Sequence, residues 1–263
     1  MAIVRDKLWI FGARAHQDDI YLYNSPETTQ NLPNSRITPA EAALMLDVPN
    51  VLMINCDGVP APFSVDAYGY MESFCRMKNV LWNSTGSSGF RVGNEESFIC
   101  ELAKRYPNVV GTYLDDFYLR FSKEPDPVER CAALLKEVRE GLDQAPRRMN
   151  IYVTWYTHDM DALDEKIMNY IDGLTLWTWK SEELPLLEER INKIAENFPQ
   201  KSKLLGIGVA VKVNVSTEAL SWRSFSFALT PNFCSSSITR SPRSLNSKPL
   251  PISLCVPITM SKV

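Results

Sequence analysis

Carboxylates and aromatic side chains follow several short apolar runs that the sequence predicts as strands. The sharpest case is Asp115-Asp116, which directly follows the run 109–114. Asp57 follows the run 51–55 closely, and Trp155 and Trp177 lie in the last residues of two later runs. Paired Asp or Glu side chains perform acid–base or nucleophilic work at an anomeric carbon, and sugar C–H faces stack on indole rings. This combination of residue types predicts chemistry on carbohydrates.

We expect Asp116, or its neighbour Asp115, to supply one catalytic carboxylate. Asp57 is the first choice for the other, with Asp159 and Glu182 as alternatives. Adjacent strand residues point to opposite faces, so at most one of Asp115 and Asp116 should face the site. Structural explanations stay open, because Asp-Gly is typical of a turn, an aspartate after a strand often caps a helix, and tryptophans often pack in a core. The expected substrate-binding residues are Arg14, His16, Asn83, Trp155, Trp177 and Trp179.

A metal hydrolase is an alternative, because His16 and His158, the two histidines of the chain, both fall at predicted strand ends. With Asp57 and one of Asp115 or Asp116 they could supply nitrogen and oxygen ligands to one zinc ion. The chain has neither an HxH pair after the first strand nor an HExxH motif. We therefore expect no metal and no organic cofactor. A sugar-binding barrel without an active acid–base pair is a further alternative.

The elements that must position these residues alternate between strand and helix signals over residues 1–212. Two helix starts combine a cap, a proline and a glutamate, at Thr38-Pro39-Ala40-Glu41 and Asp126-Pro127-Val128-Glu129. Strands joined by helical crossovers imply a parallel sheet. The expected strands are 7–12, 51–55, 80–83, 109–114, 150–155, 174–179 and 203–209, and further helices are expected over 64–78, 94–105, 131–142, 161–170 and 181–197.

The fold expected from this alternation is α/β, a (β/α)8 TIM-barrel-like domain over residues 1–212. No glycine-rich GxGxxG or GxxxxGK[ST] turn follows a strand, which argues against a doubly wound nucleotide-binding sheet. Seven strands in this length give about the same number of residues per strand as an eight-stranded barrel of about 250 residues. The eighth βα unit should then fall after residue 212, where we expect it to be missing or replaced by an irregular tail.

Residues 213–263 have a different composition, with 12 serines, 5 prolines, no glycine and no aspartate. Such a segment cannot bury enough apolar surface to offset its ordering entropy. We expect a Ser/Pro-rich basic tail that is disordered or aberrant. A frame-shifted end of the gene and a basic tail for an anionic partner are the two alternatives.

The charge balance limits the partners of the chain. Its 28 basic and 31 acidic residues give a net charge of −3, which does not favour binding to nucleic acid. No apolar run approaches the roughly 18–20 residues of a membrane span, and residues 1–6 lack the apolar core of a secretion signal. The six cysteines form no CxxC pair, and we expect them to be reduced thiols. We expect a cytoplasmic protein that acts on a small-molecule or oligosaccharide substrate; the sequence leaves the oligomeric state open.

The segment Tyr113-Leu114-Asp115-Asp116-Phe117, with tryptophans at neighbouring strand ends, resembles the glycoside-hydrolase-like TIM barrels of bacteria. In many of these the fourth strand presents an acidic catalytic residue. The resemblance implies hydrolysis of a glycosidic bond by a carboxylate pair at the C-terminal rim. The chain departs from the commonest retaining pattern, since Asn-Glu does not follow the fourth strand and the seventh ends Gly206-Ile207-Gly208-Val209-Ala210 without a carboxylate.

Overall fold

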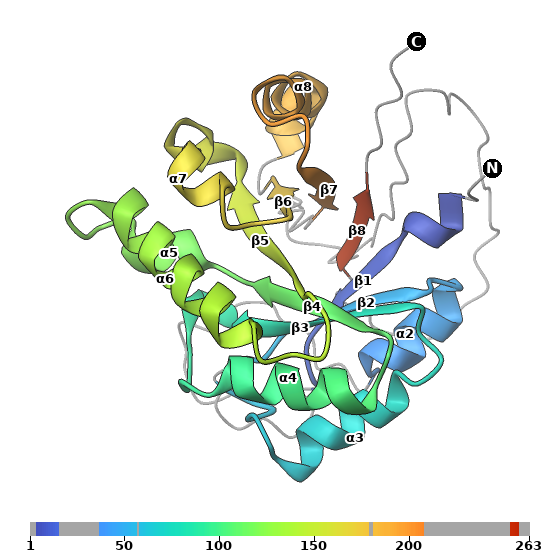
Figure 1. Cartoon of the computed structure of the whole chain (residues 1–263). Coiled ribbons are helices and arrows are strands. Elements are labelled where there is room, and N and C mark those ends of the chain that lie inside the picture. The colour runs from blue at the N-terminus through green and yellow to red at the C-terminus, as the bar shows by residue number, and fades with distance from the viewer. Residues whose placement is uncertain (1–3, 16–36, 57, 179–180, 208–252, 258–263) are drawn as a thin grey trace, which may run out of the picture.

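The strands of the protein curl into a closed sheet in a computed structural model, which describes residues 4–15, 37–56, 58–178, 181–207 and 253–257 (Figure 1). Strands β1 to β7 pair in parallel with their successors in chain order, as the alternation of strands and helices predicted. The strands are β1 (Trp9–Gly12), β2 (Asn50–Met53), β3 (Asn79–Thr85), β4 (Val109–Leu114), β5 (Asn150–Tyr156), β6 (Gly173–Trp177), β7 (Ser202–Ile207) and β8 (Ser253–Pro257).

Strand β8 closes the sheet in a way that a complete TIM barrel does not. It pairs antiparallel with both β7 and β1, whereas the eighth strand of a (β/α)8 barrel is parallel to both neighbours. The structure is therefore α/β and compatible with an incomplete TIM-like barrel, and the full (β/α)8 fold is not seen. Strand β8 is the described part of the expected tail 213–263; the remainder of that segment lies outside the described residues.

Helices lie outside the curled sheet and cover its outer face (Figure 1). The expected capping box is confirmed: Thr38 caps α2 and exchanges hydrogen bonds with Glu41. The α-helices are α2 (Pro39–Leu46), α3 (Val65–Ser73), α4 (Glu95–Arg105), α5 (Phe117–Phe121), α6 (Pro127–Leu142), α7 (Glu165–Met168) and α8 (Leu187–Asn197), and the short 3₁₀ helices are η1 (Val4–Lys7), η2 (Ser87–Gly89), η3 (Thr157–Ala162) and η4 (Ser181–Leu186).

Three helix predictions differ from the structure for local reasons. Asp126 has a left-handed backbone and does not cap α6 with its side chain. The expected helix 161–170 is divided into η3 and α7, because Asp164 adopts an extended backbone and caps α7 at Lys166. The expected helix 181–197 is divided into η4 and α8, and Pro185, which has no N–H to donate, lies at this division.

Buried side chains alternate between two apolar clusters along the strands. The larger cluster lies between sheet and helices and includes Val51 and Trp82. The smaller one fills the barrel interior. Its buried members are Trp9, Leu52, Ile54, Leu81, Tyr113 and Trp177, with Phe11, Val110, Tyr152 and Tyr156 packed against it. This alternation assigns each strand residue near the candidate site to the interior or to the outer face.

A glycine on β4 sets the alternation that reaches the candidate site. The pairing of β3 with β4 skips a residue, so that Val80 is paired with Val109 while Leu81 is paired with Gly111. A β-carbon on Gly111 would lie 2.2 Å from the carbonyl oxygen of Asn150 on β5, closer than any side chain permits. Gly111 thus allows β4 and β5 to approach, and Tyr113 two residues later points into the interior.

No helix among the described residues is long and apolar enough to cross a membrane.

Candidate active site

Asp115 lies at the C-terminal end of β4 and is held by three hydrogen bonds from neighbouring strands. Its backbone N–H donates to the carbonyl of Thr85 at 3.0 Å, and its carbonyl accepts from the Thr85 hydroxyl at 2.6 Å. Its carboxyl Oδ1 accepts from the hydroxyl of Thr154 on β5 at 2.8 Å. Only 7% of Asp115 is exposed. Backbone and side chain are therefore both fixed in the barrel interior.

Asp116 turns the chain sharply as soon as β4 ends. Its backbone is left-handed, with φ 48° and ψ 22°, a conformation that aspartate tolerates better than most residues. Oδ1 of Asp116 accepts a hydrogen bond from the hydroxyl of Tyr156, and Oδ2 accepts one from the backbone N–H of Ser88 at 2.9 Å. The turn therefore directs this carboxylate back toward β5.

The two adjacent carboxyl groups consequently meet the same face of β5. Thr154 binds Asp115 and Tyr156 binds Asp116, and residues two apart on a strand share a face. The expectation that Asp115 and Asp116 point to opposite faces is not met. It assumed an extended backbone, which the left-handed conformation of Asp116 interrupts.

The proximity of the carboxyl groups changes their electrostatics. Burial first, and then the charge of Asp116, raise the pKa of Asp115 to about 7, although the hydrogen bonds from Thr154 and from the backbone N–H of Asp116 oppose this rise. Burial and the two carboxylates also raise the pKa of Tyr156 well above its usual value. Tyr156 therefore stays protonated as the donor to Asp116, while Asp115 exchanges a proton near neutral pH.

Trp177, a predicted substrate-binding residue, lies in the barrel interior near this pair. Its indole Nε1 donates to the hydroxyl of Thr175 at 2.7 Å and lies 3.3 Å from the hydroxyl of Tyr113. Its ring meets the ring of Phe11 edge to face, with centroids 4.9 Å apart. The structure therefore brings Trp177 together with Asp115 through a set of shared hydroxyl groups.

Trp155, another predicted substrate-binding residue, lies on the opposite face of β5. Its indole packs against Phe117 and Tyr118 and donates to the carbonyl of Asp159 at 3.0 Å. Only 1% of Trp155 is exposed, in the cluster beneath the helices. This placement does not support the expected contact with a sugar, because helices cover the indole. The residues of β5 that reach the carboxyl pair are Thr154 and Tyr156, the neighbours of Trp155. Neither was among the predicted site residues.

Asn83, the expected hydroxyl-binding residue on β3, lies two residues after Leu81 and therefore faces the interior. It is paired in register with Tyr113 on β4. Although only 1% of Asn83 is exposed, neither its amide nitrogen nor its amide oxygen has a hydrogen-bond partner among the described residues. Buried polar groups are nearly always paired, so this amide is suited to a polar group from a ligand. Arg14, the other expected hydroxyl-binding residue, is half-buried just after β1.

Three predicted residues, His16, Asp57 and Trp179, lie outside the described residues. The second histidine, His158, stacks on Tyr156 with ring centroids 5.3 Å apart and planes 7° from parallel. Its side chain is half-exposed at the end of β5. Within the described part of the chain, no three His, Cys, Asp or Glu side chains are grouped so as to hold a metal ion.

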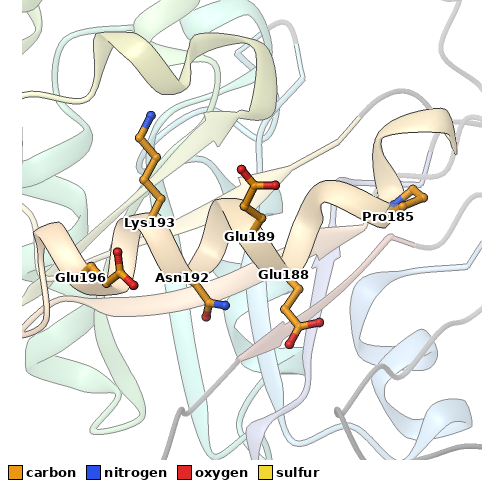
Figure 2. A pocket seen from close by; sticks show the side chains of 6 residues that line it. All are labelled: Pro185, Glu188, Glu189, Asn192, Lys193 and Glu196. Carbon is orange, nitrogen blue, oxygen red and sulfur yellow. The ribbon is translucent and has the colours of Figure 1, made fainter.

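A surface hollow lies elsewhere, along helix α8 (Figure 2). Neither Asp115 nor Asp116 lines it, and its charged side chains belong to the outer part of an amphipathic helix whose Leu187, Ile191 and Ile194 are buried. It is lined by Pro185, Glu188, Glu189, Asn192, Lys193 and Glu196. We assign the hollow no part in the candidate site.

Comparison with known proteins found no relative: no protein-family model matches the chain, and no curated protein matches it.

Proposed function

We propose that the chain is an incomplete TIM-barrel-like hydrolase that cleaves a glycosidic bond with the carboxyl pair Asp115 and Asp116. The observation that carries the proposal is the buried carboxyl of Asp115, whose pKa of about 7 is raised by burial and by the adjacent Asp116. Two carboxyl groups with different environments at the C-terminal strand ends are what glycoside hydrolysis requires. The substrate would be a small glycoside or an oligosaccharide.

Asp115 is the general acid–base of this proposal. A carboxyl group that titrates near neutral pH can both give a proton to the leaving oxygen and take one from water, because proton transfer is most efficient when the pKa lies near the working pH. The hydrogen bond from Thr154 fixes the direction of this carboxyl group. Asp115 would therefore act from a fixed position inside the rim.

Asp116 is the second carboxylate. Its oxygens accept hydrogen bonds from Tyr156 and from the N–H of Ser88, which hold them in place beside Asp115. A carboxylate in this position stabilises the positive charge that develops on the sugar ring in the transition state. Asp116 takes this role in place of Asp57, which lies outside the described residues.

Substrate recognition is assigned to Asn83 and to the exposed stack of His158 on Tyr156. The amide of Asn83 offers one acceptor and two donor hydrogens that have no partner in the described part of the chain, and sugar hydroxyl groups both donate and accept. The half-exposed ring of His158 offers an aromatic face at the end of β5. These groups suit a polyhydroxylated ring better than an apolar substrate.

The proposal is tested with a panel of aryl glycosides and the variants Asp115→Asn and Asp116→Asn. We expect each substitution to lower kcat/KM by about 100-fold or more, as loss of a positioned proton donor or charge does. Asp161→Asn is the matched control, because the Asp161 side chain is fully exposed, and it should retain wild-type turnover. Turnover that survives in the double variant Asp115→Asn/Asp116→Asn would refute the proposal.

A second candidate function is a sugar-binding barrel without catalysis. It is favoured by the low exposure of Asp115 and by the two hydrogen bonds that already occupy Asp116. Isothermal titration of the wild-type chain with the same glycosides separates the two functions. Binding without turnover would select the second function.

A further inference from the structure

A continuous chain of side-chain hydrogen bonds crosses the barrel interior and ends on Asp115. It joins strands β6, β4 and β5 in that order. The hydroxyl of Thr175 lies 2.6 Å from that of Tyr113, which lies 2.7 Å from that of Thr154. Trp177 donates to Thr175 at one end, and Thr154 donates to Asp115 at the other. All three hydroxyl-bearing residues are buried, so bulk water does not replace these partners.

The direction of the chain is fixed when Asp115 is ionised. A carboxylate only accepts, so the single hydrogen of Thr154 must point to Asp115. The hydrogen between Tyr113 and Thr154 must then come from Tyr113, and the hydrogen between Thr175 and Tyr113 must come from Thr175. The indole of Trp177 can only donate, and it supplies a lone pair of Thr175 with a partner. Every group in the chain is then paired.

The same atoms can be paired in the opposite direction when Asp115 is protonated on Oδ1. Asp115 then donates to Thr154, Thr154 donates to Tyr113, and Tyr113 donates to Thr175. The hydrogen of Thr175 has an acceptor of its own, the carbonyl of Val153 at 3.2 Å. Trp177 still donates to Thr175, because a hydroxyl oxygen accepts two hydrogen bonds. Again no buried hydroxyl loses its partner.

We propose that this chain is a reversible hydrogen-bond relay, in which the hydroxyl groups of Thr154, Tyr113 and Thr175 reverse their direction together when Asp115 gains or loses its proton. Tyr113 and Thr175 are then positioning residues for Asp115, although neither touches it. A group that alternates between acid and base must be stabilised in both protonation states, and the relay supplies both. The catalytic use of the relay rests on the proposed function, whereas the reversal itself does not.

Among the described residues outside the relay, the titratable groups that face Asp115 are Asp116, which follows it on the chain, and Tyr156 on β5. Neither is a member of the relay. Substitutions in the relay therefore leave these two in place, and a change in the titration of Asp115 reports on the hydroxyl groups themselves.

The reversal predicts opposite changes in the pKa of Asp115 for a substitution at Tyr113 and for one at Thr154. In Tyr113→Phe, protonated Asp115 can still donate to Thr154, but the Thr154 hydrogen then has no acceptor. The ionised form keeps its donor to Asp115 and loses only the Tyr113 hydrogen bond to a lone pair of Thr154, which costs less than a buried hydrogen without an acceptor. The substitution should therefore lower the pKa of Asp115 by about one unit. Thr154→Val removes the donor to the ionised form and should raise the pKa.

The experiment follows the side-chain carboxyl ¹³C shift of Asp115 against pH by NMR in the full chain. Thr175→Val is the second variant, since it removes the acceptor of Tyr113 and should also lower the pKa. Thr112→Val is the matched control: the Thr112 hydroxyl is equally buried but pairs with Ser84 and the carbonyl of Trp82. It should leave the Asp115 titration unchanged.

A lower pKa in Tyr113→Phe and in Thr175→Val, with a higher one in Thr154→Val, would support the relay. An unchanged or raised pKa in both Tyr113→Phe and Thr175→Val would overturn it, because the neutral form would then not donate into the relay. These shifts are measured without a substrate. A protein without glycosidase activity can therefore still show the pKa shifts, and an active glycosidase can lack them. Failure of the proposed function and failure of the relay are thus told apart.

Discussion

Asp116 adopts a left-handed backbone directly after Asp115, and this turn brings two neighbouring carboxyl groups to one face of β5. A regular strand would have separated them to opposite sides of the sheet. The pair combines a buried carboxyl that holds its proton near neutral pH with a carboxylate fixed by Tyr156 and Ser88.

Asp115→Asn should change how stability depends on pH. The pKa of Asp115 lies near 7 in the folded protein and near 3.8 in the unfolded chain, so the folded state binds more protons between these values. Stability contributed by this group is thus present at low pH and lost as pH rises through 7. From pH 5 to pH 8 the wild type should lose about 2–3 kcal/mol that the variant keeps. Urea unfolding of both proteins at the two pH values measures this; parallel losses would contradict it.

Asn83→Leu should stabilise the protein while it impairs binding. The substitution removes a buried amide that no described residue pairs with, so the free energy of unfolding should rise by about 1 kcal/mol. Asn79→Leu on the same strand is the control, because Asn79 donates to Asn50 at 2.7 Å, and this substitution should destabilise the fold. Thermal unfolding and glycoside binding check both effects. A destabilised Asn83→Leu protein would mean that the Asn83 amide has a partner in the free protein.

Tyr156→Phe should be more costly than Tyr106→Phe. Each hydroxyl donates to a carboxylate, Tyr156 to Asp116 at a partly buried position and Tyr106 to Glu72 on the surface. Loss of a hydrogen bond to a charged group costs about 1.5–3 kcal/mol, and an exposed one costs less than a partly buried one because water replaces the donor. Chemical denaturation of the two variants gives the comparison. Equal costs would argue that the carboxylate of Asp116 is solvated.

Gly111→Ala should destabilise the protein by about 2 kcal/mol or more, because the new methyl group would meet the Asn150 carbonyl and force β4 and β5 apart. Gly69→Ala is the control. Gly69 lies exposed inside α3 with no atom near its missing β-carbon, so alanine should stabilise the helix by about 0.5–1 kcal/mol. Thermal unfolding of both variants is the measurement. A tolerated Gly111→Ala would show that the two strands are less closely packed than described.

The alternation of strands and helices was predictable because apolar periodicity and caps are local properties. The order of the parallel strands and the Thr38–Glu41 capping box followed from them. The antiparallel direction of β8 did not, since Ser253–Pro257 pairs with strands distant in the sequence, and low-complexity composition does not reveal such pairing.

The candidate site was predictable at Asp115 and Asp116 but only in part around them. Side chains alternate between the two faces of β5, so either Trp155 or its neighbours Thr154 and Tyr156 can face the interior. Residue type alone favoured Trp155, because indole rings stack on sugars. The pairing shift at Gly111 and the left-handed turn at Asp116 decide in favour of Thr154 and Tyr156. Residue spacing specifies neither the pairing of strands nor the left-handed backbone of a single residue.

The most direct test of the account is the titration of Asp115 in the wild type and in Asp116→Asn, followed by the carboxyl ¹³C shift with Asp115→Asn as the assignment control. We expect a midpoint near 7 in the wild type. In Asp116→Asn we expect a lower midpoint that stays above the usual aspartate value, because burial persists when the neighbouring charge is removed. A midpoint near 4 in both proteins would contradict the assignment of Asp115 as the buried acid of the pair.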